Sequence, residues 1–595
     1  MFILAFLPVV IASYKHTKQE YCSIYAVATD CRPPPDAFLH IPARDLASDE
    51  AKTEILEDAF SALAVLQNEY YQIGKNTWPS AIDWTAAVTE TVVSGMLSTL
   101  TKSIDLIIPG ITPGIREAQE NLISSVFDQV IGYHFAQDIV AIRDQAFDDI
   151  LWVVLGWIEA VNFARSHDGI RFPEAEHSPN ASFPTDVHAA LALLPWRGHL
   201  WIPSFQSRAK SFWLLGAQGW DTALCHGGMV WNPRLEPYKN AITNELYISA
   251  SISMYQHMSN GSVADKDPLH LQAAIEGYKW LVNSNMMNRE GLYADGFHIG
   301  RRKHGGVECN IRDEMVYTYN QGVLLTGQRG LWDVTGSPSY LEDGHNLIQA
   351  VIKATGWSLK TNRPIDSVDV SAKLPKWRGL GRGGILEEKC DASGTCSQDG
   401  QTFKGIYFHH LTAFCRPLDK DNLNDDDNLN DGDYIDIDGF TRVKAAHKSA
   451  CQAYLGWIKH NALAALTSRD SRGRFGMWWG SALFGNIHVS RASDGIDHDA
   501  VNATDYRKDG TPNNDLWGRD SRWLPGSWKR GLDKQVTPED YEKMDMLDLT
   551  EKPMRKLKHR PSDPNDRGRG RTVETQVGGV AVLRAYWDIS QSLSS

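Results

Sequence analysis

The chain has 595 residues and a formal net charge of −13, because 73 Asp and Glu residues outnumber 60 Lys and Arg residues. This acidic balance argues against nucleic acid as the main partner, since phosphate binding needs a concentrated positive field. Hydrophobic residues make up 42% of the chain and charged residues 22%, which is the range of a globular rather than a disordered protein. The 20 tryptophans are the unusual feature, and side chains of this size fill a core or line a site.

The first residues have the pattern of a secretory signal. Phe2–Ala12 is an apolar run with small residues at its end, long enough for a signal-peptide core and too short to cross a bilayer. We therefore expect a signal peptide at 1–12, an N-terminal extension at 13–50, and a secreted or cell-wall protein without a membrane span. A buried N-terminal segment is the alternative interpretation. The sequence WDISQSLSS at the C-terminus carries no hydrophobic tail, so a GPI anchor is not expected.

The cysteines favour disulfides. There are eight, an even number, and none has the CxxC spacing of a zinc site. Three pairs are close enough in sequence to bond across a short loop or between neighbouring helices: Cys22 with Cys31, Cys390 with Cys396, and Cys415 with Cys451. N-glycosylation sequons at Asn180, Asn260 and Asn502 are a further hint of secretion.

Helical periodicity dominates from residue 51 onward, and strand signals are sparse. The runs 150–158 and 247–255 are apolar on nearly every side, which is typical of helices buried inside a larger protein. The windows expected to be helical are 51–73, 86–103, 116–140, 146–166, 208–219, 239–258, 268–285, 316–333, 339–354, 445–467 and 574–592. Eleven or twelve helices without βαβ alternation predict one all-α domain over 51–595, and two layers of helices wrapped in a toroid would use this count.

Two polar segments interrupt the helical pattern. Residues 416–439 are rich in Asp and Asn, but Leu429 and Tyr434 stand where a calcium loop needs oxygen ligands, so a solvated acidic loop is favoured. Residues 500–572 are expected to form a long polar insertion. Its basic run RGRGR at 567–571 could bind an anion, and a solvated loop is the favoured interpretation.

No cofactor and no metal is expected. Walker A, HExxH and GxSxG patterns are absent. Gly379, Gly381 and Gly384 match GxGxxG, but the flanking residues make a poor strand and a poor dinucleotide-binding helix. The pair His409 and His410 has no third residue at the spacing of a metal site, so packing or solvent contact is expected for both side chains.

The sharpest feature is the adjacent pair Asp148 and Asp149, placed where a buried helix begins. One Asp there would serve as a helix cap, but two repel each other in a partly dry site, which raises one pKa and leaves the other group ionised. A glycosidase needs one protonated acid and one carboxylate. Neighbouring Cα atoms lie about 3.8 Å apart, so the carboxyl groups reach the roughly 5 Å separation of retaining enzymes more readily than the 6.5–9.5 Å of inverting ones.

Several segments together resemble glycoside hydrolase family 76, the endo-α-1,6-mannanases, and most of all its fungal branch. The segment GGMVWNPRLEPYKNAITNELYISASISMY at 227–255 is the nearest match, and AFDDILWVVLGWIEAVNF at 146–163 resembles the family's Asp-Asp-x-x-Trp segment. Further matches follow the family order at 63–88, 291–297, 317–327 and 403–411, and 574–585 resembles the closing helix. Arg143 and the residues after it depart from the family's approach to the Asp pair.

The resemblance implies an (α/α)6 toroid that hydrolyses internal α-1,6-mannosidic bonds with retention of configuration. Carried over by position, Asp148 would be the nucleophile and Asp149 the general acid/base; the spacing alone does not decide this order. Flat faces for sugars would come from Trp84, Trp152 and Trp231, for each of which core packing is the alternative. Candidates for bonds to sugar hydroxyls are Asp295, Thr318, Tyr319, Asn320 and Asn244, the last as readily a helix cross-link.

Three functions remain open from the sequence. The first is a monomeric, secreted mannanase acting on α-mannan or another mannose-containing glycan, without cofactor. The second is a cell-wall transglycosidase acting on the mannose core of a glycolipid anchor, in which a sugar rather than water resolves the glycosyl-enzyme. The third is a non-catalytic glycan-binding protein.

Overall fold

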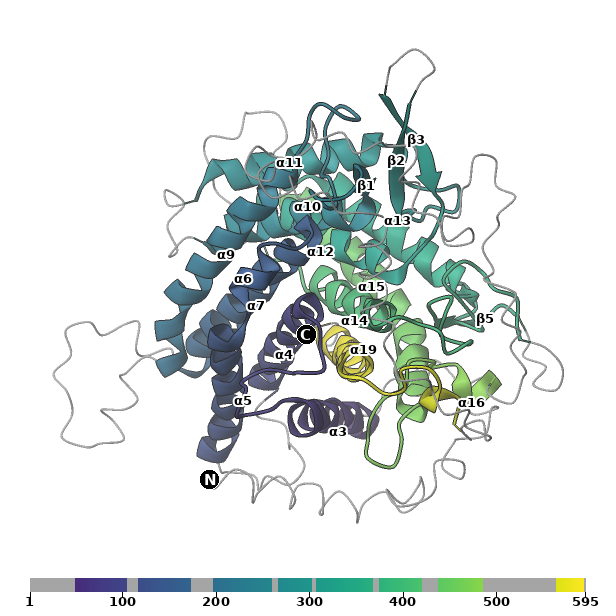
Figure 1. Ribbon diagram of the computed structural model, residues 1–595. Coiled ribbons are helices and arrows are strands. Elements are labelled where there is room, and N and C mark those ends of the chain that lie inside the picture. The colour runs from purple at the N-terminus through teal and green to yellow at the C-terminus, as the bar shows by residue number, and fades with distance from the viewer. Residues whose placement is uncertain are drawn as a thin grey trace, which may run out of the picture.

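Twelve long helices of the described residues alternate between an inner and an outer layer of a toroid (Figure 1). They are seen in a computed structural model that describes residues 49–103, 116–172, 196–258, 266–301, 307–366, 374–419, 437–484 and 563–592. The predicted signal peptide, the pair Cys22 and Cys31, the three sequons, and most of the acidic loop and the polar insertion lie outside these residues.

The inner layer is a closed ring of six helices. Each helix contacts the next one in the chain, and the last contacts the first. In chain order they are α4 (Asp83–Lys102), α7 (Phe147–Arg171), α10 (Ala241–His257), α12 (Thr318–Thr335), α14 (Gln398–Phe414) and α19 (Val573–Ser592). This closed order confirms the predicted (α/α)6 toroid.

The outer layer supplies one helix before each inner helix. These helices are α3 (Asp49–Val65), α5 (Arg116–Ala136), α9 (Ile202–Gly216), α11 (Pro268–Asn283), α13 (Pro338–Ala354) and α15 (Ile437–Thr467). Because outer and inner helices alternate along the chain, all six inner helices point the same way. Contacts between the ends of α4 and α19 agree with this: Thr85 meets Glu574 near the two N-termini, and Thr99 meets Asp588 near the two C-termini.

The inner helices are buried on nearly all sides, as the apolar runs predict. Every residue of α10 from Ala241 to Tyr255 is buried. Glycines allow these helices to approach closely: a Cβ on Gly322 of α12 would lie 2.6 Å from Cα of Tyr407 in α14. The core of the ring is therefore a dense contact between helices and not an open channel.

All the predicted helical windows contain helix, and one inner helix, α14, was not predicted. Polar residues and glycines in α14 obscure the helical pattern of its sequence. Its Lys404 is buried because the ammonium group pairs with Asp391 and donates to the carbonyl of Met477 at 2.8 Å. This is a case in which tertiary contacts outweigh local pattern.

Short strands and short helices connect the long helices of the toroid. The strands β1 (Tyr238–Asn240), β2 (Gly296–Arg301) and β3 (Val307–Asp313) form an antiparallel sheet in the order β1-β2-β3, in which Asn240 pairs with Gly296. Two-residue strands form the hairpins β4 (Trp357–Ser358) with β5 (Arg363–Pro364), and β6 (Gly381–Arg382) with β7 (Ile385–Leu386). The GxGxxG match lies at this last hairpin. The remaining short helices are η2 (Leu66–Tyr70), α6 (Ile139–Ile142), η4 (Arg197–Trp201), η5 (Ala217–Gly219), α16 (Ser481–Phe484) and η10 (Pro564–Asp566).

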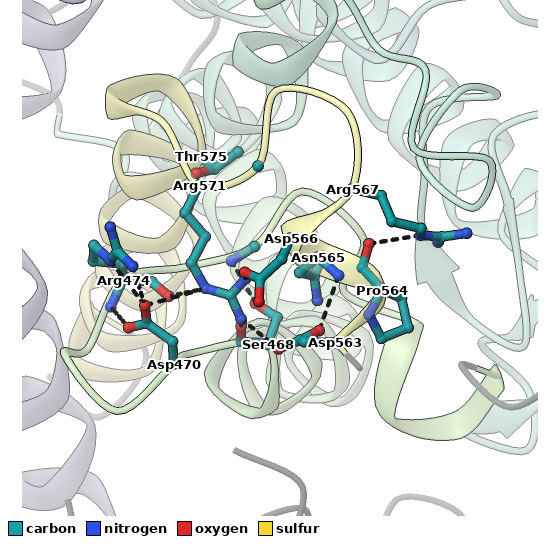
Figure 2. A network of polar contacts seen from close by, with 12 residues as sticks. Ser468, Asp470, Arg474, Asp563, Pro564, Asn565, Asp566, Arg567, Arg571 and Thr575 are labelled. Carbon is teal, nitrogen blue, oxygen red and sulfur yellow. Dashed lines mark hydrogen bonds and ion pairs between the residues drawn. The ribbon is translucent and has the colours of Figure 1, made fainter. Parts of the chain in front are cut away.

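A buried arginine fixes the segment that leads into α19 (Figure 2). The side chain of Arg571 is 1% exposed, and its guanidinium pairs with Asp563 at 2.7 Å and Asp566 at 2.9 Å. It also donates to the carbonyls of Ser468 and Arg474, on the segment that follows α15. The expectation of a solvated loop is therefore wrong for Arg571, because these bonds hold its guanidinium against the segment after α15, whereas Gly568 and Arg569 are exposed as expected.

Three disulfides occur in the described residues. Cys390–Cys396 and Cys415–Cys451 confirm two of the expected pairs, and the second joins the end of α14 to α15. The third, Cys225–Cys309, was not predicted, because its cysteines are 84 residues apart in sequence and meet only through the sheet. No helix in the described ranges combines the length and the apolar character needed to span a bilayer.

Candidate active site

The predicted carboxyl pair lies at the N-terminal end of α7, beside the N-termini of the other inner helices. Ala146 precedes the helix, and its N–H donates to Asp149 Oδ2 at 3.2 Å, so Asp149 closes a cap across the first turn. The N–H of Phe147 donates to the carbonyl of Trp231 at 2.9 Å. Helix N-termini stabilise negative charge, so this end of the toroid is suited to carboxylates.

Asp148 is held by two N–H donors. Its Oδ2 accepts from the indole Nε1 of Trp231 at 3.0 Å, and its Oδ1 accepts from the backbone N–H of Asp149 at 3.1 Å. Donors of this kind favour the ionised form of a carboxyl group. Asp149 accepts one such bond, from Ala146.

Burial raises the pKa of both carboxyl groups. The negative charge of Asp149 raises the pKa of Asp148 further, well above its usual range. The pKa of Asp149 is raised to about 7, mainly by burial and also by the charges of Asp399 and Asp83, while the Ala146 N–H and Arg234 lower it. The pair therefore retains a proton near neutral pH.

Trp231 is positioned by a tightly bonded loop. The buried Lys239 donates to the carbonyls of Leu224 at 2.7 Å and Gly228 at 3.0 Å. The fully buried amide of Asn244 bonds both the N–H and the carbonyl of Met229, two residues before Trp231. Asn244 thus contacts protein and not the open site, and it acts on the pair through the loop that carries Trp231.

Trp84 and Asp399 lie on the α14 side of the pair. The indole of Trp84 donates to Asp399 Oδ1 at 3.1 Å, and its ring stacks on that of Trp152 at 5.8 Å between ring centres. Trp152 is buried, whereas Trp84 is half-buried. Of these two predicted platforms, Trp84 is the one whose face reaches solvent.

Asp295 and Asn320 lie together at the edge of the sheet. Asp295 Oδ2 accepts from the hydroxyl of Tyr238 at 2.6 Å, and Oδ1 accepts from the amide of Asn320 at 3.3 Å. The carbonyl of Asp295 also accepts the first N–H of α10, from Ala241, at 2.7 Å. The half-buried carboxylate is thus held rigidly between α10 and α12.

Tyr319 links these groups to the carboxyl pair. Its ring stacks on Phe403, with ring centres 3.9 Å apart and planes 6° apart. Burial raises the pKa of Tyr319, and the nearby charges of Asp295, Asp148 and Asp399 raise it further. In contrast, Thr318 is fully buried and donates its N–H and hydroxyl to Glu388 inside the protein.

Sequence reasoning missed several groups at this end. A shared sequence signal could have found some of them. Each of three inner helices has an acidic residue in its first turn, and that residue accepts a hydrogen bond from another segment of the chain. Asp83 of α4 accepts from Gln145 at 2.7 Å, Asp399 of α14 accepts from Trp84, and Glu574 of α19 accepts from Thr85 at 2.8 Å. Tyr238, Phe403 and Glu388 had no such signal.

Two groups among the described residues bring metal-binding atoms together: His345 with His447 and Cys451, and Cys390 with Asp391 and Cys396. Neither includes a residue of the carboxyl pair. Their cysteines are joined in disulfides and have no thiolate to offer a metal.

A buried pair of carboxyl groups with raised pKa values thus lies at one end of an (α/α)6 toroid, among aromatic and polar side chains. Residues 202–429 match the family model described as glycosyl hydrolase family 76. The matched residues begin at α9 and do not include Asp148 or Asp149.

Curated fungal relatives agree with the family. The chain is 23% identical over 215 residues to mannan endo-1,6-alpha-mannosidase DFG5 of Saccharomyces cerevisiae, which is 35% of this chain and 39% of that protein. It is 24% identical over 217 residues to mannan endo-1,6-alpha-mannosidase DCW1 of the same yeast, again 35% and 39%. The chain thus matches about two fifths of the length of these relatives.

Solved structures give more distant similarities. One is an inactive variant of alpha-1,6-mannanase GH76A of Salegentibacter in complex with alpha-1,6-mannotriose, with 15% identity, a TM-score of 0.45, and coverage of 90% of this chain and 99% of that one. Another is Dfg5 from Chaetomium thermophilum in complex with glucosamine, with 16% identity, a TM-score of 0.44, and coverage of 74% and 85%.

Proposed function

We propose that this protein is a retaining endo-acting glycoside hydrolase that cleaves α-1,6-mannosidic bonds, with Asp148 as nucleophile and Asp149 as general acid/base. The observation that carries the proposal is the unequal hydrogen bonding of two adjacent carboxyl groups that retain a proton between them. Burial and the charge of Asp149 raise the pKa of Asp148, and its two N–H bonds oppose this rise and favour its carboxylate, while the pKa of about 7 suits Asp149 to proton transfer. The names of the fungal relatives support the substrate class.

The reaction follows from these roles. In the first step Asp149 gives its proton to the glycosidic oxygen as an oxygen of Asp148 attacks the anomeric carbon, so a mannosyl ester forms and the leaving sugar departs with the proton. In the second step Asp149, now a carboxylate, takes a proton from water, and the water oxygen displaces Asp148 from the anomeric carbon. Two inversions give net retention.

Three half-buried side chains and the buried Asn320 lie near the pair and are suited to bind the sugars. The partly exposed side chain of Trp84 can pack against sugar C–H groups, and the half-buried Tyr319 can offer its hydroxyl to a sugar. Asp295 and Asn320 already share a hydrogen bond, so their orientation is set before a glycan binds. Pre-organised polar groups of this kind fix the orientation of a substrate at low entropic cost.

Two substitutions and two substrates test the roles. We expect Asp148→Asn and Asp149→Asn each to lower the cleavage of linear α-1,6-mannan by at least about 10²-fold. On an aryl α-mannoside, whose leaving group needs no proton, Asp149→Asn should still release the aryl alcohol in a first-turnover burst, while Asp148→Asn should not. The control is Asp138→Asn, which changes the exposed cap of α6 and should leave activity unchanged.

Product analysis decides between the alternatives. Release of mannose reducing ends that are initially α by proton NMR supports the retaining hydrolase, and β products would contradict it. Transfer of the glycosyl group to an added mannoside would identify the transglycosidase instead. Binding of mannan without turnover by the wild-type protein would identify a glycan-binding protein.

We also propose that the protein works as a monomer in the secretory pathway or the cell wall. Three disulfides in the described residues support an oxidising compartment. Fractionation of the producing cells tests this: protein found only in the cytosol, with reduced cysteines, would contradict it. Sedimentation of the purified protein tests the monomer.

A further inference from the structure

The toroid has a second polar site at the opposite end from the carboxyl pair. A cavity of about 40 Å³ lies among α4, α7, α10, α12 and α14, near the ends of α10 and α14. Its wall includes Glu159, His257, His409, His410 and Arg416. The proposed glycosidase mechanism uses none of these side chains, so this cavity needs a separate explanation.

Guanidinium groups surround the cavity. Arg329 lines it and is fixed by Asp333 at 2.9 Å and by the carbonyl of Phe414 at 3.0 Å. Arg584, just behind His409, is fixed by Asp588 at 3.2 Å. Arg416 is exposed, and its Nε donates to the carbonyl of Ala413 at 3.2 Å. The terminal nitrogens of Arg416 meet no acceptor among the described residues.

His409 offers a hydrogen-bond donor to the cavity. The side chain is buried, and Arg584 Nη1 donates to its Nδ1 at 3.1 Å. Because arginine has only donors, Nδ1 must be the acceptor, and the neutral ring carries its proton on Nε2. This Nε2–H has no acceptor among the described residues and belongs to a residue of the cavity wall. Burial lowers the pKa of His409, and the charges of Arg584 and Arg416 lower it further, which keeps this imidazole neutral.

Two other ligand classes fit less well. A sugar ring is too large for about 40 Å³, whereas a tetrahedral oxyanion is of that order. A metal ion needs converging ligands, and in the described part of the chain no three imidazole or carboxylate atoms of this cavity lie within 4.8 Å of one another. Cations near helix C-termini are stabilised by the helix dipole, which accounts for the place of Arg416 but not for the buried Nε2–H of His409.

We propose that this cavity binds a phosphate group, as inorganic phosphate or as the end of a phosphate monoester, between the guanidinium of Arg416 and the Nε2–H of His409. Glu159 is the carboxylate that faces the site, and it repels an anion on its own side. The phosphate therefore lies toward His409 of α14 and Arg416, which stands two residues beyond the last residue of that helix, Phe414. This proposal does not depend on the glycosidase function.

Calorimetry on the full-length protein tests the site with two probes, inorganic phosphate and glycerol 1-phosphate, at constant ionic strength. We expect saturable binding that Arg416→Gln weakens at least tenfold. Arg569→Gln, a change of an exposed arginine elsewhere, should leave the affinity unchanged, as should Asp148→Asn at the other end. His409→Gln should weaken binding as well, and its melting temperature will show whether it folds.

The two probes separate the sources of the phosphate. Equal affinity for both indicates a free anion, and tighter binding of the ester indicates a monoester ligand. Glycerol without a phosphate group is the control ligand. The proposal is overturned if neither probe binds, if glycerol binds as tightly as glycerol 1-phosphate, or if Arg416→Gln binds both probes as tightly as the wild type does.

Discussion

The indole of Trp231 gives the sharpest test of how the carboxyl pair is tuned. Trp231→Phe keeps an aromatic ring but removes the N–H that Asp148 Oδ2 accepts at 3.0 Å. A hydrogen bond to a charged group contributes about 1.5–3 kcal/mol, and one pKa unit corresponds to about 1.4 kcal/mol. The pKa of Asp148 should therefore rise by a further 1–2 units, roughly.

The direction of the kinetic effect follows from the role of Asp148. The nucleophile must be ionised in the free enzyme, so a higher pKa moves the acidic limb of the kcat/KM profile to higher pH. At a pH on that limb, kcat/KM on α-1,6-mannan should fall about 10- to 100-fold. Trp84→Phe is the matched control, because it removes an indole N–H whose acceptor is Asp399 and should leave the acidic limb in place.

The assay is the pH dependence of kcat/KM for the wild type and both variants, with unfolding curves to verify their stability. An acidic limb that does not move in Trp231→Phe, with kcat/KM within twofold of the wild type, would refute the idea that this bond controls Asp148. A limb that moves equally in both variants would show that the effect is not local to Asp148.

Arg571→Met should lower the free energy of unfolding by about 3–5 kcal/mol in urea titration, because it removes the ion pair of the buried carboxylate of Asp563, whereas the exposed Arg569→Met should change it by less than about 0.5 kcal/mol. Asp149 has a folded pKa of about 7 against an ordinary 3.8, so the folded state holds its proton more tightly and stability falls as pH rises from about 4 to 7. Asp149→Asn should flatten this fall, and unfolding curves at pH 4 and 7.5 that keep the wild-type difference would contradict the shift. Replacing Cys415 and Cys451 together by Ala opens a disulfide that spans 36 residues and should cost about 4 kcal/mol, so a loss below about 1 kcal/mol would argue against its effect on the unfolded chain.

The parts of the fold and site that the sequence predicts are those with local signals. α7 and α10 were predicted because a helix that is apolar on every side is evident from consecutive residues. The Asp pair was found for the same reason, since Asp148 and Asp149 are neighbours in the chain. α14 was not predicted, because its Lys404 is acceptable in a core only once Asp391 and the carbonyl of Met477 are in place.

The remaining site required through-space information. Trp231 was a predicted sugar platform, but the bond from its indole to Asp148 joins residues 83 positions apart in sequence. Asp399 could be recognised as a helix-start carboxylate, yet its meeting with Trp84 depends on the closure of the ring. Arg571 was expected in solvent because Ser468, which accepts one of its hydrogen bonds, lies 103 residues away.

The ring closure by α19 has a consequence for synthesis. α19 contacts both α4, the first inner helix, and α14, the inner helix before it, so the circle is complete only when these residues are present. On the ribosome, α19 is made after α4 and α14, and the apolar faces of these helices that contact α19 stay uncovered until then. The nascent chain therefore needs protection from aggregation over most of its length. A chain that stops before Val573 would lack α19 and leave the apolar faces of α4 and α14 exposed.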